Sequence, residues 1–187
     1  MSDAESLTVF TVGHSNVTRD DFLRLLLAAG IEVLVDVRTS PYSRYASQFN
    51  EPDLRFGAHA VELKYVPMGA QLGGRPSGQH LYDSEGHVVY ARVAREDFFH
   101  SGIELLVRGA RTHRIAIMCS EENPIDCHRR LLVGRVLQDE GVTVLHLRGD
   151  GRLQAESEVR AEEIVLHTDR VQLGLFTSEE ETWRSIR

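Results

Sequence analysis

The stretch Met118–Leu132, MCSEENPIDCHRRLL, concentrates residue types that can do chemistry. It contains two thiols, two adjacent carboxylates and the sequence Cys-His-Arg-Arg. The apolar run 115–118 that leads into it is typical of a short buried strand. Asn123-Pro124 is expected to break this strand, and Asp126 is expected to cap a helix that runs to Gly141. The stretch therefore predicts a site at a junction between a strand and a helix.

Arg129 is the most unusual residue of this predicted helix. On a wheel of 3.6 residues per turn it falls on the apolar face, whereas Arg130 falls at the edge of that face. A buried guanidinium needs an anionic partner, because burying an unpaired charge costs too much free energy. We expect that partner to be a carboxylate of this chain, Asp36 or Glu121, or else an anionic ligand.

Cys119 ends the predicted strand close to the start of this helix. A thiol in that position can have a depressed pKa and act as a nucleophile. The alternative, which the sequence alone favours, is that Cys119 packs as a small apolar residue. Seven residues separate Cys119 from Cys127, and this matches no common zinc spacing, although His14 or His128 would complete a ligand set. We predict no metal.

Several established enzyme classes are not expected. The chain lacks the C-x5-R signature of cysteine phosphatases and rhodaneses, and Asp126 and Glu121-Glu122 would repel a phosphate in this loop. No Walker motif and no G-x-G-x-x-G is present, so ATP and NAD are not implied and no cofactor is predicted.

Strands alternate with helices along the chain, which predicts an α/β fold: a three-layer sandwich around a mainly parallel sheet. Strands are expected at 7–12, 32–37, 63–66, 115–118 and 142–147. Helices are expected at 18–29, 51–61, 88–99, 103–111, 126–140 and 156–166. The glycine-rich segment 69–78 is expected to be a mobile lid or binding loop. Residues 1–168 should form one domain, and 169–187 a loosely attached polar tail with one short apolar motif.

Polar residues follow three of the predicted strands at the point where each strand ends. In such folds the ligand crevice lies outside the carboxyl ends of the strands, so we expect the three clusters to line one pocket. The clusters are His14, Ser15 and Asn16; Asp36 and Arg38; and Cys119, Ser120, Glu121 and Glu122.

Roles can be assigned to these residues by chemical type. An acid–base or nucleophilic role suits His14, Asp36, Cys119, Glu121 and Glu122. Ligand binding suits Ser15, Asn16, Arg38, Arg44, Tyr45, Ser120, His128 and Arg129, because arginines and a helix N-terminus bind phosphate or carboxylate groups. Each role has a structural alternative. His14 could be a buried histidine with internal hydrogen bonds, Glu121 and Glu122 could be solvated, and Arg129 could form an internal ion pair. The aromatic residues near Tyr45 could simply anchor their loop.

Motifs along the chain resemble the DUF488 family. They are Val12–Asn16 (VGHSN), Asp36–Arg38 (DVR), Ser40–Phe49 (SPYSRYASQF), Met68–Gly74 (MGAQLGG) and Met118–Leu132. The resemblance covers roughly residues 7–150 and implies a Rossmann-like α/β domain with a site at these motifs. It implies no specific reaction, since the function of that family is unknown.

Composition bounds the possible functions. A net charge of −7 argues against a protein that coats nucleic acid non-specifically, and no apolar run is long enough to span a membrane. With two cysteines and no signal peptide, a cytoplasmic location is expected. We expect an enzyme, a metal-independent hydrolase or a glycosidase that removes a base. Its substrate is expected to be a nucleotide, a nucleic-acid base or a related anionic metabolite. The alternative is a non-catalytic adaptor that binds a nucleotide or nucleic acid.

The tail contains one apolar motif, QLGLF, formed by Gln172, Leu173, Leu175 and Phe176 around Gly174. It resembles the pentapeptide with which bacterial replication and repair proteins dock on the sliding clamp. Exposed apolar anchors on a polar segment suit recognition by a pocket on a partner. The alternative is that these side chains fold back on the domain. Docking on the clamp would connect either function to DNA maintenance.

Overall fold

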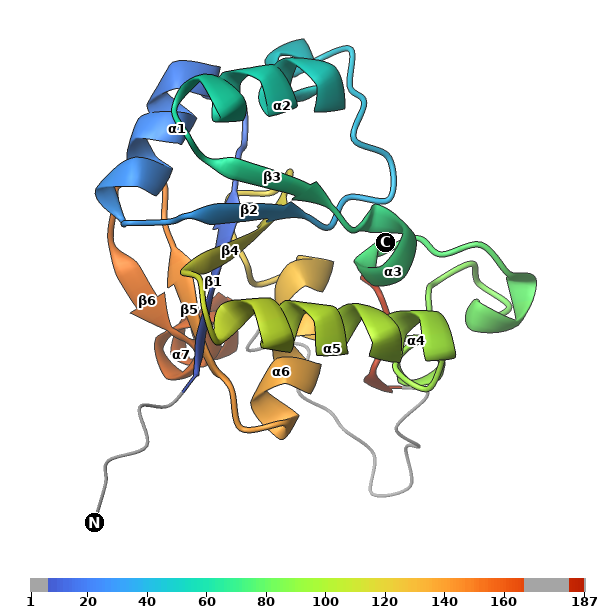
Figure 1. Ribbon diagram of the computed structural model, residues 1–187. Coiled ribbons are helices and arrows are strands. Elements are labelled where there is room, and N and C mark those ends of the chain that lie inside the picture. Colours follow the sequence, from blue (N-terminus) through green and yellow to red (C-terminus); the bar gives the residue numbers. More distant parts are fainter. Residues whose placement is uncertain (1–6, 167–181, 187) are drawn as a thin grey trace.

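The computed structural model describes residues 7–166 and 182–186, and its centre is a six-stranded sheet (Figure 1). The strand order is β3-β2-β4-β1-β5-β6, in which the first five strands are parallel and β6 is antiparallel to β5. The strands are β1 (Thr8–Gly13), β2 (Val33–Asp36), β3 (Lys64–Pro67), β4 (Ile115–Cys119), β5 (Thr143–Leu147) and β6 (Leu153–Ala155).

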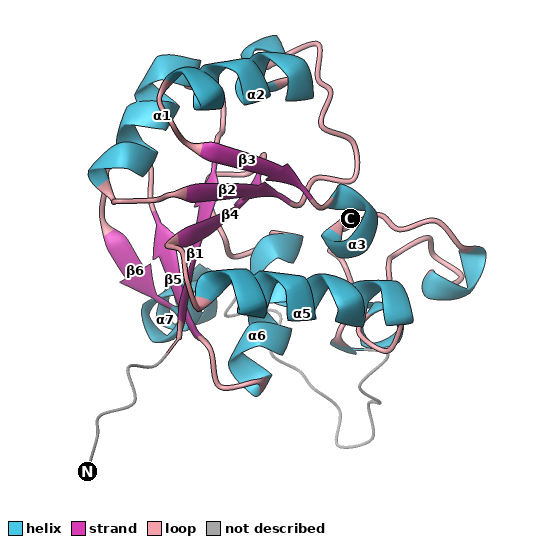
Figure 2. Cartoon of the chain, viewed as in Figure 1, coloured by secondary structure: helices cyan, strands magenta, loops and turns pink. Residues whose placement is uncertain are grey.

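Helices cover both faces of the sheet, which confirms the predicted three-layer α/β sandwich (Figure 2). One face packs against α1 (Arg19–Ala28) and α2 (Glu51–Ala60), and the core between them includes Phe22 and Leu54. The other face packs mainly against α5 (Asp97–Ala110) and α6 (Arg135–Asp139). The remaining helices are α3 (Gly69–Leu72), α4 (Tyr90–Val93) and α7 (Glu156–Leu166). Because adjacent side chains of a strand point to opposite faces, β4 supplies Ile115 and Ile117 to one core and Ala116 and Met118 to the other.

The boundaries of α1 lie within one residue of the predicted range 18–29 and are set by local capping interactions. The Thr18 hydroxyl accepts a hydrogen bond from the Asp21 N–H at 3.1 Å, as a helix N-cap does. Gly30 ends the helix at a φ of 68°, a left-handed conformation that favours glycine.

The segment 88–111 and the sheet edge at β6 differ from the sequence expectations. The helix predicted at 103–111 is the C-terminal part of α5, but the predicted break before it and the helix predicted at 88–99 are wrong: α4 is a single turn, and α5 runs without a break through residues 100–102. The polar residues in that gap, His100 and Ser101, are exposed and lie on the solvent side of one amphipathic helix. The prediction also missed β6, a short edge strand without a clear apolar pattern.

The helix after Cys119 starts later than predicted and is wound differently. Asp126 lies in a turn and does not cap it; a π-helical segment spans Arg129–Gly134 and continues into α6. Arg129 is buried, as the wheel predicts. Arg130 is also buried, so its expected edge position is wrong. A π turn is wider than an α turn, and the wheel for 3.6 residues therefore misplaces neighbouring side chains.

The glycine-rich segment is tightly packed at its start, so the prediction of a mobile lid is wrong for residues 69–74. A Cβ on Gly69 would lie 2.0 Å from the Arg38 carbonyl oxygen, and one on Gly74 would lie 2.6 Å from Cγ of His128. Here glycine permits close approach between segments. Close packing therefore explains why glycine occurs at positions 69 and 74, and flexibility does not.

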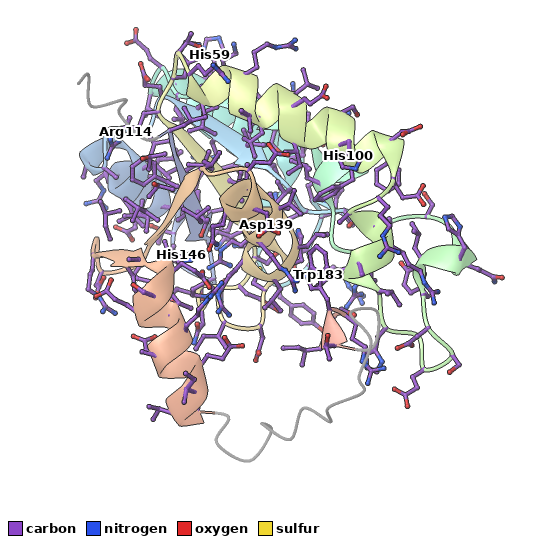
Figure 3. The ribbon with its side chains drawn as sticks, turned by 90° about the horizontal axis from the view of Figure 1, so that it is seen from below. His59, His100, Arg114, Asp139, His146 and Trp183 are labelled. Carbon is purple, nitrogen blue, oxygen red and sulfur yellow. The ribbon has the colours of Figure 1, made fainter. Side chains whose placement is uncertain are left out.

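Residues 182–186 contact the domain, which the expectation of a loosely attached tail did not anticipate. Trp183 packs beside the π-helical segment and α6, where its indole N–H donates to the Leu131 carbonyl at 2.6 Å and Arg135 lies over its ring (Figure 3). Ser185 is buried, and its N–H donates to the Val88 carbonyl at 2.8 Å. Within the described ranges, no helix has both the length and the apolar character needed to cross a membrane.

Candidate functional site

A cavity of about 410 Å³ opens at the carboxyl edge of the sheet, beyond the ends of β2 and β4. Parallel α/β sheets bind ligands at this edge. Among the predicted site residues, five line the cavity: Arg38, Cys119, Ser120, Glu121 and His128. The other predicted site residues do not line the cavity, and the contacts described below explain their positions.

Cys119 and His128 face each other on the cavity wall. Cys119 is the last residue of β4, and its Sγ lies 3.6 Å from Nδ1 of His128. The Nε2 of His128 lies 3.0 Å from the Val37 carbonyl oxygen. A carbonyl only accepts hydrogen bonds, so Nε2 carries the proton of the neutral ring and Nδ1 presents its lone pair to the thiol. Gly74 packs against this ring and holds it in place.

The surroundings of Cys119 favour the thiolate. A hydrogen bond with Cys127, the charge of Arg129 and the backbone N–H groups of the following loop lower the pKa of Cys119 to about 7, although burial opposes them. The same hydrogen bond and burial raise the pKa of Cys127 well above its usual value. The two thiols therefore differ in character, and Cys119 is the one that lines the cavity.

Arg38 is held by a carboxylate that does not reach the cavity. Its guanidinium donates to both oxygens of Asp36, at 2.9 Å from Nε and 2.6 Å from Nη2. The Tyr65 hydroxyl donates to the same carboxylate at 2.6 Å. Asp36 is 1% exposed and does not line the cavity. It is committed to fixing Arg38.

His14 lies behind Arg38. Its Nδ1–H donates to the Ser15 carbonyl at 2.7 Å, and its Nε2 accepts from Nη1 of Arg38 at 3.2 Å. Its ring stacks on Phe49 with 4.1 Å between the centroids. Burial, with the nearby arginine charges, lowers the pKa of His14 to about 4. The ring is neutral near pH 7 and positions Arg38.

The expected carboxylate partner of Arg129 is wrong: the Arg129 guanidinium donates to main-chain carbonyls and a hydroxyl. Its Nη1 and Nη2 donate to the main-chain carbonyls of Glu121 and Glu122, and its Nε donates to the Thr11 hydroxyl at 3.3 Å. Arg129 therefore fixes the backbone of the loop that follows Cys119. Its charge acts on the thiols at close range.

The remaining predicted residues do not line the cavity. Glu122 forms a two-pronged ion pair with Arg148, with both distances 2.9 Å. The exposed residues Ser15 and Asn16 lie on the turn after β1, and Arg44 and Tyr45 are exposed on the loop before α2. The convergence prediction thus holds for Arg38, Cys119 and Glu121, whereas His14 and Asp36 support the site from behind.

The cavity wall also includes residues that were not among the predicted site residues: Thr39, Ser40, Tyr90, Asp126, Ser185 and Ile186, together with Gly74 and Arg75 from the segment 69–78 that was expected to be a lid or binding loop. Arg75 directly follows the glycine pair of the motif Met68–Gly74, and this position is the one signal that pointed to it. Tyr90 and Ser185 carry no local signal, because only the tertiary fold brings them to β4. The tail motif of Gln172, Leu173, Leu175 and Phe176 lies outside the described residues.

Comparison with known proteins gives one match. No curated protein and no solved structure matches the chain. A family model described as "Domain of unknown function DUF488" matches residues 18–136, which is more than half of the chain and includes Asp36, Arg38, Cys119, His128 and Arg129. The chain belongs to the DUF488 family.

Proposed function

We propose that this protein is a thiol-dependent enzyme, a hydrolase or group-transfer enzyme that acts on a nucleotide or a related anionic metabolite. Cys119 is the nucleophile and His128 accepts its proton. The observation that carries the proposal is the pair itself: a sulfur 3.6 Å from an imidazole nitrogen whose partner nitrogen is fixed by a backbone carbonyl. A nucleophile, a base and a group that orients the base are the elements of nucleophilic catalysis.

The cavity supports this substrate class through its charges and its size. Arg38 and Arg75 offer donors to a phosphate or carboxylate, while Glu121 and Asp126 offer acceptors on the same cavity wall. A ligand with an anionic group and an amino group, as in a nucleotide, satisfies both sets. A volume of about 410 Å³ lies within the usual range for small-molecule sites.

Removal of a base by two carboxylates has less support than thiol chemistry. That reaction needs a general acid and a second carboxylate on either side of the scissile bond. Of the carboxylates expected to serve, Asp36 is bound to Arg38 and Glu122 to Arg148, and neither lines the cavity. Glu121 alone of the three does.

In the proposed reaction Cys119 Sγ attacks an electrophilic carbon of the substrate while its proton moves to Nδ1 of His128. The bond to the leaving group breaks, and His128 returns the proton to that group. A water molecule, or a second substrate in a transfer reaction, then attacks the thioester carbon, gives a proton to His128 and releases Cys119, which recovers that proton. Atoms and charge balance without an oxidant or a reductant.

Competition between alkylation and ligand binding tests the proposal. Iodoacetamide, added in the presence of a metal chelator, should label Cys119 before Cys127, and inorganic phosphate or nucleoside monophosphates should slow the labelling. His128→Gln should slow it as well, whereas Gln79→Ala, an exposed change outside the cavity, should not. Preferential labelling of Cys127, or labelling that no anion slows, would contradict the proposal. A thermal-shift screen of nucleotides and modified bases then identifies the ligand.

The adaptor function remains a prediction from the motif at Gln172–Phe176. A fluorescent peptide of residues 168–187 should bind purified bacterial sliding clamp, and Leu175→Ala with Phe176→Ala should eliminate the binding. Absence of binding at high micromolar clamp would remove this alternative. The alkylation test does not depend on the outcome.

A further inference from the structure

Three metal-ligand side chains meet beside the cavity. They are Cys119 at the end of β4 and Cys127 and His128 just before the π-helical segment, and one donor atom from each lies within 4.8 Å of the others. Both cysteines are buried, and neither is in a disulfide. The sequence spacing of the cysteines gave no sign of this cluster, because the loop between them folds back on itself.

The distance between Cys119 Sγ and His128 Nδ1 matches the distance expected between two ligands of one metal ion. With Zn–S of about 2.3 Å and Zn–N of about 2.0–2.1 Å, tetrahedral coordination puts a sulfur and a nitrogen ligand roughly 3.6 Å apart. Cys119 Sγ and Nδ1 of His128 lie 3.6 Å apart. The third donor, Sγ of Cys127, needs to lie roughly 3.8 Å from Cys119 Sγ, which the 4.8 Å limit allows.

The protonation of His128 is an independent observation that points to a ligand. Its Nε2–H is committed to the Val37 carbonyl at 3.0 Å, so the Nδ1 lone pair faces the two thiols. Metal-bound histidines almost always donate their other ring N–H to a carbonyl or carboxylate in this manner. The backbone that supplies this carbonyl is itself fixed, because the Val37 N–H donates to the Met118 carbonyl at 3.1 Å.

We propose that Cys119, Cys127 and His128 form a binding site for a divalent transition-metal ion, with zinc as the best match. Two thiolates offset the charge of the ion, and two sulfurs with one imidazole nitrogen form a ligand set that suits zinc. Cys119 and His128 line the cavity, so the fourth coordination position faces it. Three protein ligands and one open position are the arrangement of a catalytic zinc site, whereas structural sites are closed by four.

A second group of potential ligands in the described ranges is already satisfied as an ion-pair cluster. Asp83, Glu85 and His87 also lie close together. Arg184 donates to Asp83 at 2.6 Å and to Glu85 at 3.0 Å, so a cation of the chain already occupies that group. It therefore serves as a control region.

The metal site is independent of the proposed thiol chemistry but excludes it while the ion is bound. The lone pairs of Cys119 and His128 that bind a metal are those that attack the substrate and accept the proton. Zinc-loaded protein should therefore resist alkylation at Cys119, and metal-free protein should not. The two proposals are tested on different samples, so failure of one leaves the other measurable.

Titration of the full-length chain tests the site. Reduced protein, freed of metal and chelator, is titrated with Zn²⁺ against a chromogenic competitor, and the expected result is one tightly bound ion per chain. Co²⁺ in place of Zn²⁺ should give thiolate-to-metal charge-transfer absorption. Cys127→Ala and His128→Asn should each weaken binding by roughly 100-fold or more, since changes to outer partners of ligands alone cost 10–100-fold.

Matched controls make the result decisive. His59 on α2 and His100 on α5 are exposed histidines that do not belong to the cluster (Figure 3). His100→Ala and His59→Ala should leave the affinity unchanged, and so should Asp83→Asn. If Cys127→Ala does not fold, His128→Asn carries the test, because its ring is only partly buried. No bound Zn²⁺ at micromolar concentrations, or equal affinity in His128→Asn and His100→Ala, would overturn the proposal.

Discussion

Two buried groups of histidine, arginine and carboxylate flank β1, and their hydrogen bonds connect the three residues in a different order. At the site, Asp36 binds Arg38 and Arg38 binds His14, so the arginine is central. On the side of α7, Glu156 binds both Arg130 at 2.9 Å and His146 at 3.0 Å, so the carboxylate is central. Arg38 also donates to the Phe49 carbonyl at 2.8 Å, which leaves one N–H of Nη1 for a ligand. The central carboxylate of Glu156 is instead satisfied by cationic or N–H partners on both sides.

The electrostatic consequences of the two arrangements differ as well. Burial, reinforced by the charge of the neighbouring Arg38, lowers the pKa of His14 to about 4. Burial likewise lowers the pKa of His146, but the carboxylate of Glu156 opposes the shift. The pKa of Glu156 falls to about 2, because its hydrogen bonds to His146 and Arg130 outweigh its burial. Arg38 lines the cavity and Arg130 does not, so we assign function to the first group and stability to the second.

Removal of Arg38 should have the largest effect. Arg38→Met leaves the carboxylate of Asp36, which is 1% exposed, without its cation, and should lower the free energy of unfolding by about 3–5 kcal/mol. Urea unfolding followed by circular dichroism measures the loss. Adding Asp36→Asn should restore much of the stability without restoring anion binding. If the double variant is no more stable than the single one, Asp36 is not the group that Arg38 satisfies.

The pH dependence of stability should expose His14. Its folded pKa of about 4 lies below the unfolded value of about 6.5. The unfolded chain therefore binds more protons between these values, and stability is complete above pH 6.5 and falls as the pH drops toward 4. The His14 part of this loss is at most about 3 kcal/mol.

His14→Gln should flatten the curve of unfolding free energy against pH, most clearly in the upper part of this window. The remaining slope comes from His146 and, toward pH 4, from carboxylates with a lowered pKa such as Glu156. Urea unfolding at half-unit pH steps measures it. An unchanged slope in His14→Gln would mean that the imidazole of His14 is protonated in the folded protein, which would contradict its assigned role as a neutral support for Arg38.

Arg130→Met should cost less than Arg38→Met although both arginines are buried. Glu156 keeps His146, which can take up a proton, and Glu163 is partly exposed to water. We expect a loss of about 2 kcal/mol, below the range for a fully buried pair, with no change in alkylation of Cys119. Arg24→Met, which breaks the exposed pair with Asp21, is the control and should cost less than about 1 kcal/mol. A loss as large as that of Arg38→Met would remove the distinction between the two groups.

The sequence predicts the first group better than the second, for a physical reason. His14, Asp36 and Cys119 follow apolar strand patterns, and parallel strands bring their carboxyl ends to one edge. Whether a side chain at that edge lines the cavity or supports it depends on hydrogen bonds that no local pattern encodes. Arg130 was misplaced because π winding broke the assumed period.

The residues that complete the site could not be found from local patterns at all. Tyr90 reaches the cavity from α4 and Ser185 from the C-terminal stretch, while the carbonyl that orients His128 belongs to an apolar residue, Val37. The glycine-rich segment was recognised, but it was predicted to be mobile, whereas its first part is tightly packed. Gly74 lets the His128 ring approach the backbone closely. A glycine in the sequence does not show whether it serves close approach or flexibility.

The smallest effects should separate two exposed arginines: Arg44, which the sequence predicts to bind a ligand, and Arg75, to which it assigns no role. Arg75 lines the cavity beside Arg38, whereas Arg44 does not. Arg75→Ala should weaken binding of inorganic phosphate, measured by its protection of Cys119 from alkylation, about 10-fold, or roughly 1.4 kcal/mol. Arg44→Ala should change it by less than about 2-fold. Both variants make the net charge more negative by one, so long-range attraction falls equally, and any difference reports direct contact with the anion. Equal losses would place the anion outside the cavity and assign its binding to the general field of the protein.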